Sequence, residues 1–379
     1  MTDVVIAAYR RSPFHFAGKG ELARVRPDEL VAQVMRALLA ESKADPAAIE
    51  DVVMGCAFPE GEQGLNIARL ASFLAGLPQA AGGVTVNRFC GSSMQAVHQA
   101  AGAIRMGAGE AFLCAGVESM SRVPIMGFNP LPHPGLAKDF PQAYISMGET
   151  AENVARRHQI PRREQEEFAA ESQRRAAKAQ AEGYFASEIV PIRTRAGTVE
   201  QDGCIRPDTT PEGLAGLKPA FSKDGTVTAG TSSPLTDGAA ALLVCSGEHA
   251  RSRGMEPLAR IRGIAVAGCA PEIMGMGPVE ASRKALTRAG IGVGDLDVVE
   301  LNEAFASQSI ACIRELGLDP ALVNIDGGAI ALGHPLGATG ARIVGKAAAL
   351  LRRQNGRYAL ATQCIGGGQG IATVLEAVE

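Results

Sequence analysis

Cys90 lies where a predicted strand meets a predicted helix, a position that can activate a thiol. Val84 to Asn87 has the pattern of a short strand, and Ser92 to Met106 has the composition of a helix. Free N–H groups and the positive end of a helix dipole stabilise a thiolate, and they also bind oxyanions. The position predicts nucleophilic chemistry, although a cysteine at a helix start is more often a structural residue.

A histidine and a second cysteine lie in glycine-rich segments of the C-terminal half. His334 stands in GGAIALGHPLGATGAR, where an imidazole can act as base for a thiol or simply satisfy a backbone carbonyl. Cys364 follows a predicted strand and precedes three glycines, which let the backbone approach a ligand. Asn302 and Glu303 end the predicted buried strand Val298 to Leu301, where polar residues indicate a site or a cap.

An internal repeat indicates how the chain positions these residues. Asp28 to Phe58 and Val279 to Phe305 each read as an amphipathic helix, a turn, a strand starting Asp-Val-Val, and then Ala-Phe. The repeat predicts a duplicated α/β domain, the alternative being generic helix–strand alternation. We expect one half in residues 1–118 and 234–255, an inserted domain in 119–233, and the second half in 256–379.

Composition excludes several classes of function. The chain has 379 residues, with 37 Lys and Arg against 40 Asp and Glu, so its net charge of −3 argues against a nucleic-acid-binding protein. No apolar run approaches the roughly 20 residues of a membrane helix. None of the eight cysteines forms a C-x-x-C pair, which argues against a zinc ribbon. Without a recognisable targeting signal, the expected location is cytoplasmic.

Taken together, four segments resemble the signature blocks of the thiolase family, in the same order: NRFCGSSMQA, NEAFA, GGAIALGHPLGATGAR and CIGGGQG. The resemblance continues through SMGETAENVA and IRPDTT, and so covers essentially the whole chain. It implies two similar α/β halves packed as a five-layered αβαβα sandwich, with a loop domain inserted in the first. It also implies a homodimer or homotetramer, with a hydratase/dehydrogenase partner in some β-oxidation complexes.

The resemblance implies a role for each candidate residue. Cys90 would be the nucleophile that becomes acylated, and His334 would take its proton and hold the thiolate as an ion pair. Cys364 would be the second acid and base, and Asn302 would hold a water at the enolate oxygen. The N–H groups of Cys90 and Gly366 would form a second oxyanion hole. The implied contacts to coenzyme A are Ser233, Met147, Met274 and Phe221 along the pantetheine and Arg206 near the nucleotide.

The implied activity is cleavage of a 3-oxoacyl-CoA by CoA, with ping-pong kinetics and no metal or prosthetic group. CoA would be a co-substrate. IRPDTT, GTVTAGTSS and NRFCGSSMQA are most similar to the degradative 3-ketoacyl-CoA thiolases of fatty-acid β-oxidation, since biosynthetic members typically carry Gly where Ser93 stands. Three alternatives stay open: an acetyl-CoA acetyltransferase acting on acetoacetyl-CoA, a Cys–His hydrolase, and a non-catalytic acyl-CoA-binding protein.

Overall fold

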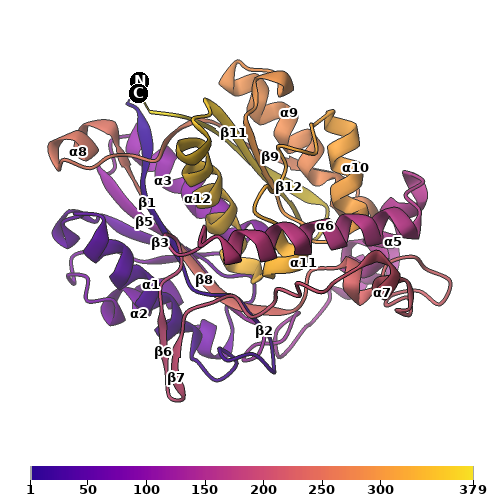
Figure 1. The fold of residues 1–379 in the computed structure, drawn as a ribbon. Helices are drawn as coiled ribbons and strands as arrows, with labels where there is room; N and C mark the ends of the chain where they lie inside the picture. The colour runs from indigo at the N-terminus through magenta and orange to yellow at the C-terminus, as the bar shows by residue number, and fades with distance from the viewer. Residues whose placement is uncertain (1, 379) are drawn as a thin grey trace.

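The protein is built around one ten-stranded sheet, seen in a computed structural model that describes residues 2–378 (Figure 1). The strand order is β10-β11-β12-β9-β1-β8-β5-β3-β4, and β2 pairs with β8 beside this path. The strands of the N-terminal half are β1 (Val4–Arg11), β2 (His15–Phe16), β3 (Asp51–Gly55), β4 (Val84–Val86), β5 (Ala111–Ser119) and β8 (Thr236–Ser246). Those of the C-terminal half are β9 (Ala259–Gly268), β10 (Val298–Leu301), β11 (Tyr358–Ile365) and β12 (Gln369–Glu376).

The two halves repeat the same strand pairings in mirrored order. In the first half β3 pairs with β5 in parallel, and β5–β8 and β8–β1 are antiparallel. In the second half β10 pairs with β11 in parallel, and β11–β12 and β12–β9 are antiparallel. A parallel bridge between Val299 and Val323 takes the place that β4 has beside β3. The predicted duplication is therefore confirmed.

The halves meet in a short antiparallel pairing of β1 with β9, at Val5–Arg260 and Ile6–Ala259. This pairing makes the sheets of the two halves continuous, a feature that the sequence did not predict. It also brings the two repeats together around a shared set of helices.

The helices complete five layers. Two helices pack against each other and contact strands of both halves, α3 (Ser92–Arg105) and α12 (Leu336–Gln354). The outer layer of the first half is α1 (Pro27–Glu41) and α2 (Ile67–Leu74), and that of the second half is α9 (Gly277–Ala289) and α10 (Ala306–Leu316). Three apolar clusters fill the spaces between these layers. The expected αβαβα arrangement is confirmed.

Small residues let the two central helices approach closely. A side chain at Gly340 of α12 would place its Cβ 2.3 Å from the backbone nitrogen of Met94 in α3, so only glycine fits there. The backbone N–H of Ala341 donates to the hydroxyl of Ser93 at 2.8 Å. The N-terminal turns of α3 and α12 are thereby held side by side, and each follows a candidate catalytic residue.

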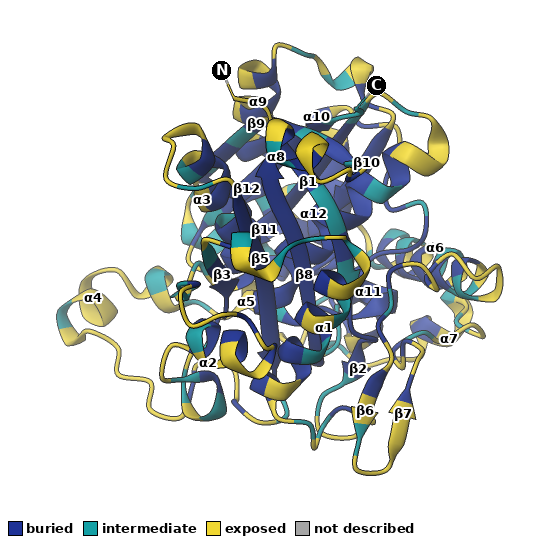
Figure 2. Cartoon of the chain, turned by 90° about the vertical axis from the view of Figure 1, so that its left-hand side faces the viewer, coloured by how far each residue is buried: buried dark blue, intermediate teal, exposed yellow. Residues whose placement is uncertain are grey.

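The segment between β5 and β8 lies outside the repeat. Its elements are α4 (Pro134–Asp139), α5 (Met147–Arg157), α6 (Arg162–Ala181), β6 (Ile192–Thr194), β7 (Gly197–Val199) and α7 (Pro211–Ala215). The remaining helices of the halves are α8 (Gly247–Ser252) and α11 (Ala329–Leu332). In Figure 2 the α4 region and the β6–β7 hairpin extend away from the buried body of the molecule.

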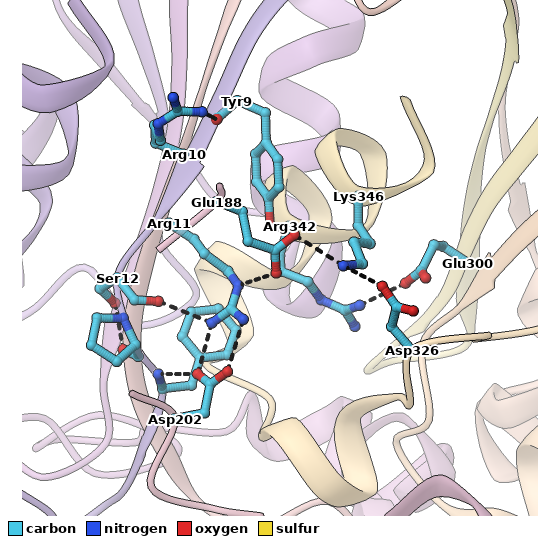
Figure 3. Close-up of polar contacts among 12 residues, drawn as sticks. Tyr9, Arg10, Arg11, Ser12, Glu188, Asp202, Glu300, Asp326, Arg342 and Lys346 are labelled. Atoms are coloured by element: carbon cyan, nitrogen blue, oxygen red, sulfur yellow. Dashed lines mark hydrogen bonds and ion pairs between the residues drawn. The ribbon is translucent and has the colours of Figure 1, made fainter. Parts of the chain in front are cut away.

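A buried ion network ties this inserted segment to both halves (Figure 3). Arg11 of β1 pairs with Asp202 at 2.7 Å and with Glu188 at 2.8 Å. Lys346 of α12 pairs with Glu188 at 3.1 Å and with Asp326 at 2.7 Å. All five side chains are buried, where an unpaired charge would be strongly destabilising, so the network fixes α12 relative to the other elements.

Candidate active site

A tight turn presents Cys90 just before α3. Residues Phe89–Gly91 form a single 3-10 turn, and Phe89 has a φ of 42°, which is strained for an aromatic residue. The side chain of Asn87 accepts the N–H of Phe89 at 2.8 Å, and the Ser92 hydroxyl donates to the Phe89 carbonyl at 2.6 Å. These bonds hold the strained turn and place Cys90 at the positive end of the helix.

Burial is the largest influence on the pKa of the Cys90 thiol. Burial raises its pKa to about 11, while the backbone N–H groups of Gly366 and of Cys90 itself act in the opposite direction. This direction is opposite to the lowered thiol pKa that a thiolate–imidazolium pair would give, because burial disfavours charge on either partner. The two N–H groups that favour negative charge at this sulfur are those expected to form an oxyanion hole.

His334 is a buried, neutral base whose two ring nitrogens both have partners. Its Nε2 lies 3.3 Å from Nδ2 of Asn302, and its Nδ1 lies 2.6 Å from Oγ1 of Thr339. Its backbone N–H donates to the hydroxyl of Thr236 at 3.0 Å. Burial and then the positive charge of Arg342 lower the pKa of His334 to about 3. The imidazole is therefore kept neutral, and a proton that it accepts must be stabilised by its hydrogen-bond partners.

Cys364 lies at the end of β11, fully buried beside the first thiol. Its pKa is raised well above the ordinary value, by burial first and then by the nearby Cys90. Cys364 belongs to a small apolar cluster with Met274 and Phe305. The structure thus brings together two thiols that are 274 positions apart in sequence numbering (364 − 90).

Three of the five residues expected to contact coenzyme A lie near these two thiols, Met147, Met274 and Phe221. A side chain at Gly366 would lie 3.4 Å from the sulfur of Met147, and Met274 packs in the cluster with Cys364. The Phe221 and Phe305 rings meet edge to face, with centroids 5.8 Å apart.

The other two expected contacts differ in their surroundings. The hydroxyl of Ser233 donates to the carbonyl of Ala304 at 3.1 Å, two residues from Asn302. Arg206 makes its contacts elsewhere: its backbone N–H donates to Gln173 of α6, and its guanidinium lies 5.9 Å from the centroid of the Phe16 ring. The structure therefore groups Ser233 with the site, and it leaves Arg206 apart from these residues.

One direct neighbour of Cys90, Gln363, is not predicted from the sequence. Gln363 donates its side-chain amide to the Cys90 carbonyl, and only its adjacency to Cys364 pointed to it. Glu303, in contrast, faces away from His334: its carboxylate accepts from Ser172 at 2.6 Å and from Asn324 at 2.9 Å. Of the two polar residues after β10, Asn302 alone contacts His334.

Within residues 2–378, no helix is long and apolar enough to cross a membrane. The same range contains no cluster of three or more His, Cys, Asp or Glu side chains suited to a metal ion.

The duplicated halves and their central helices define a thiolase-type fold. The structure superposes with a TM-score of 0.92 on the acetyl-CoA acetyltransferase of Bacillus anthracis, at 41% identity over 100% of this chain and 99% of that one. The TM-score is also 0.92 for human mitochondrial 3-ketoacyl-CoA thiolase in complex with CoA, at 39% identity over 100% and 98% of the two chains.

Sequence comparisons agree with the fold. The family model "Thiolase, N-terminal domain" matches residues 4–248, and "Thiolase, C-terminal domain" matches residues 255–377. The 3-ketoacyl-CoA thiolase of Aeromonas hydrophila is 50% identical over the full length of both chains. That of Bacillus subtilis is 46% identical over 99% of this chain and 100% of its own. The chain belongs to the thiolase family.

Proposed function

We propose that this thiolase cleaves 3-oxoacyl-CoA with CoA, giving acetyl-CoA and a shortened acyl-CoA in fatty-acid β-oxidation. The observation that carries the proposal is the proximity of Cys90 to Cys364, with the Cys90 turn packed against α12, the helix that follows the Asn302-bonded His334. One thiol can hold the acyl group while the other donates and accepts protons. The full-length similarity to proteins named 3-ketoacyl-CoA thiolase supports the choice of substrate.

The first half-reaction transfers the acyl group to the enzyme. The proton of Cys90 moves to Nε2 of His334 as the sulfur attacks C3 of the substrate. The C2–C3 bond breaks, and its electrons form the enolate of acetyl-CoA. A water held by Asn302, together with His334, stabilises the enolate oxygen, and Cys364 protonates C2. Acetyl-CoA then leaves.

The second half-reaction returns the enzyme to its resting state. The Cys364 thiolate takes the proton of incoming CoA, whose sulfur attacks the acyl carbon on Cys90. The N–H groups of Cys90 and Gly366 stabilise the oxyanion, and the Cys90 sulfur leaves and regains its proton from His334. A single covalent intermediate shared by two steps implies ping-pong kinetics. In this scheme CoA is a co-substrate, and no step uses a metal or prosthetic group.

The inserted segment supplies most of the proposed coenzyme A contacts. Met147, Phe221 and Ser233 would line the pantetheine together with Met274 of the second half, and their position around Cys364 and Gly366 supports this assignment. Arg206 would contact the nucleotide, which lies furthest from the reacting thioester. The contacts of Arg206 with Gln173 and Phe16, away from the two thiols and His334, fit that role.

The free edge of the sheet supports a homodimer or homotetramer. β4 is the last strand of the sheet, and apolar side chains on the adjacent α2 are exposed, Leu70, Phe73 and Leu74. An exposed edge strand beside apolar surface is typical of a contact between chains. A hydratase/dehydrogenase partner and a cytoplasmic location are further proposals, the latter because both catalytic cysteines must remain reduced.

The second candidate function is acetoacetyl-CoA cleavage by an acetyl-CoA acetyltransferase, favoured by the similarity to the Bacillus anthracis enzyme. Thiolysis of acetoacetyl-CoA and 3-oxohexadecanoyl-CoA distinguishes the two. Activity that extends to the long chain supports the proposal, whereas activity confined to acetoacetyl-CoA supports the second candidate. Release of free acid in place of acyl-CoA would indicate a hydrolase, and the absence of any acyl-enzyme would indicate a binding protein.

A further inference from the structure

Among residues 2–378, the hydroxyl of Thr339 is the only side-chain group that forms a hydrogen bond with Nδ1 of His334, at 2.6 Å. Thr339 lies in the first turns of α12, five positions after the histidine, and is completely buried. The same hydroxyl is 3.0 Å from the carbonyl oxygen of Pro335, to which it donates. A threonine hydroxyl has a single hydrogen, so an oxygen that donates to Pro335 must accept from the imidazole.

The contact at Nε2, the other ring nitrogen of His334, assigns the ring proton to the same atom, Nδ1. Nδ2 of Asn302 faces Nε2 of His334 at 3.3 Å, and an amide nitrogen only donates. Nε2 therefore accepts and Nδ1 carries the proton. The bonds form one directed chain, in which Asn302 donates to Nε2 of His334, Nδ1 of His334 donates to Thr339, and Thr339 donates to the carbonyl of Pro335.

We propose that Thr339 is a positioning residue that fixes His334 in the tautomer with its proton on Nδ1 and an unprotonated Nε2. This inference rests on the proposed function, since Nε2 is the atom that receives the Cys90 proton. A ring with its hydrogen on Nε2 could not accept that proton. Thr339 is not a catalytic residue, because its hydroxyl bonds to the imidazole and to the Pro335 carbonyl and not to a reacting sulfur.

Thr339 also supports the protonated ring. His334 precedes the N-terminus of α12, whose dipole disfavours a cation, and Arg342 of the same helix adds a positive charge. The carboxylates near this region are already engaged: Glu300 pairs with Arg342 at 2.6 Å, and Glu118 accepts the N–H of Gly337 at 2.9 Å. The Thr339 oxygen remains bonded to Nδ1–H after Nε2 is protonated, so it helps to stabilise the imidazolium.

Three variants separate this role from packing. Thr339→Val keeps the shape of the side chain and removes its hydroxyl, whereas Thr339→Ser keeps the hydroxyl. Thr287→Val is the matched control, because the Thr287 hydroxyl makes the same backward bond, to the Arg283 carbonyl at 2.9 Å, on α9 without a histidine. Melting temperatures identify any loss that reflects unfolding.

The tautomer is read directly by nitrogen NMR of protein labelled with ¹⁵N-histidine, with the His334 signals assigned from a His334→Asn sample. The wild-type and Thr339→Ser proteins should show a protonated Nδ1 and an unprotonated Nε2, and Thr339→Val should show a mixture or the opposite form. A wild-type ring protonated on Nε2 would overturn the inference. This readout does not depend on which substrate the enzyme uses.

Kinetics with acetoacetyl-CoA complete the test. We expect Thr339→Val to lower kcat about 10- to 100-fold, as is usual for partners that orient a reacting group, with little change in KM. The acidic limb of the pH profile of its acylation step should move to lower pH, because a less stabilised imidazolium has a lower pKa, while Thr339→Ser and Thr287→Val stay close to wild type. A Thr339→Val enzyme with wild-type kcat, or a Thr339→Ser enzyme equally impaired, overturns the inference and leaves the proposed function intact. A wild-type protein inactive on every 3-oxoacyl-CoA overturns the proposed function instead.

Discussion

The side-chain amide of Gln363 donates to the backbone carbonyl of Cys90, so a residue of the second half holds the nucleophile turn of the first. Both groups are buried, and Gln363 is the residue directly before Cys364. The position of one catalytic thiol is thus coupled to the strand that carries the other. The strained φ of Phe89 makes this anchor more important, because a turn without it can relax.

Replacing Gln363 with Leu should loosen the nucleophile turn. The Cys90 carbonyl would be left buried without this partner, which costs about 1–3 kcal/mol in the free energy of unfolding. We also expect slower acylation of Cys90, measured by mass spectrometry after mixing with substrate. Gln33→Leu is the control, because Gln33 makes a comparable bond to the Arg193 carbonyl at 3.2 Å in an exposed position. Equal acylation rates in the two variants would contradict the anchoring role.

Cys90→Ser should abolish formation of the acyl-enzyme, because an alkoxide is far harder to generate than a thiolate in this buried turn. Mass spectrometry of the protein after incubation with acetoacetyl-CoA measures the covalent adduct. Cys245→Ser, a change at a buried cysteine of β8, serves as control and should still be acylated. Normal labelling of the Cys90→Ser protein would remove Cys90 from the mechanism.

Cys364→Ala should separate the two half-reactions. Acylation of Cys90 should persist at a reduced rate, while steady-state thiolysis falls by about 10²–10⁴-fold, the range for loss of a general acid or base. The measurement compares the amount of acyl-enzyme with the rate of CoA-dependent turnover. Full turnover in this variant would show that another group supplies the proton.

The reactivity of Cys90 toward iodoacetamide should rise steeply with pH. Because burial raises its pKa to about 11, the thiolate is scarce at neutral pH and increases about tenfold with each pH unit below that value. An exposed thiol with an ordinary pKa near 8.5 would level off earlier. Mass spectrometry of the alkylated cysteine follows the rate. A rate that is constant from acidic to alkaline pH would instead indicate a preformed ion pair with His334.

Lys346→Met should strongly destabilise the protein. The substitution keeps most of the side-chain volume but leaves Glu188 and Asp326 buried with less positive charge, and breaking such a pair costs about 3–5 kcal/mol. Lys178→Met is the control, since its pair with Glu182 is exposed and is worth about 0–1 kcal/mol. Denaturant unfolding measures both. Similar losses in the two variants would show that the network adds little to stability.

The sequence by itself predicted the duplicated α/β architecture and, through its resemblance to the thiolase family, the proposed reacting groups. Repeated apolar patterns with matching Asp-Val-Val and Ala-Phe segments predict two equivalent halves, because local periodicity reflects which face of each element is buried. Cys90, His334 and Cys364 stand out because each lies beside glycines or a helix start, features that are local in the chain. The inserted segment was also visible, from its different composition.

Only the tertiary structure decided how these residues are supported. Gln363 reaches Cys90, and Lys346 pairs with Glu188, across large separations in sequence. Such contacts depend on how α3 and α12 pack between the halves and on the joining of β1 to β9, and neither leaves a periodic signal in the chain. The raised pKa of Cys90 likewise follows from burial, which is a property of the assembled fold and not of the motif.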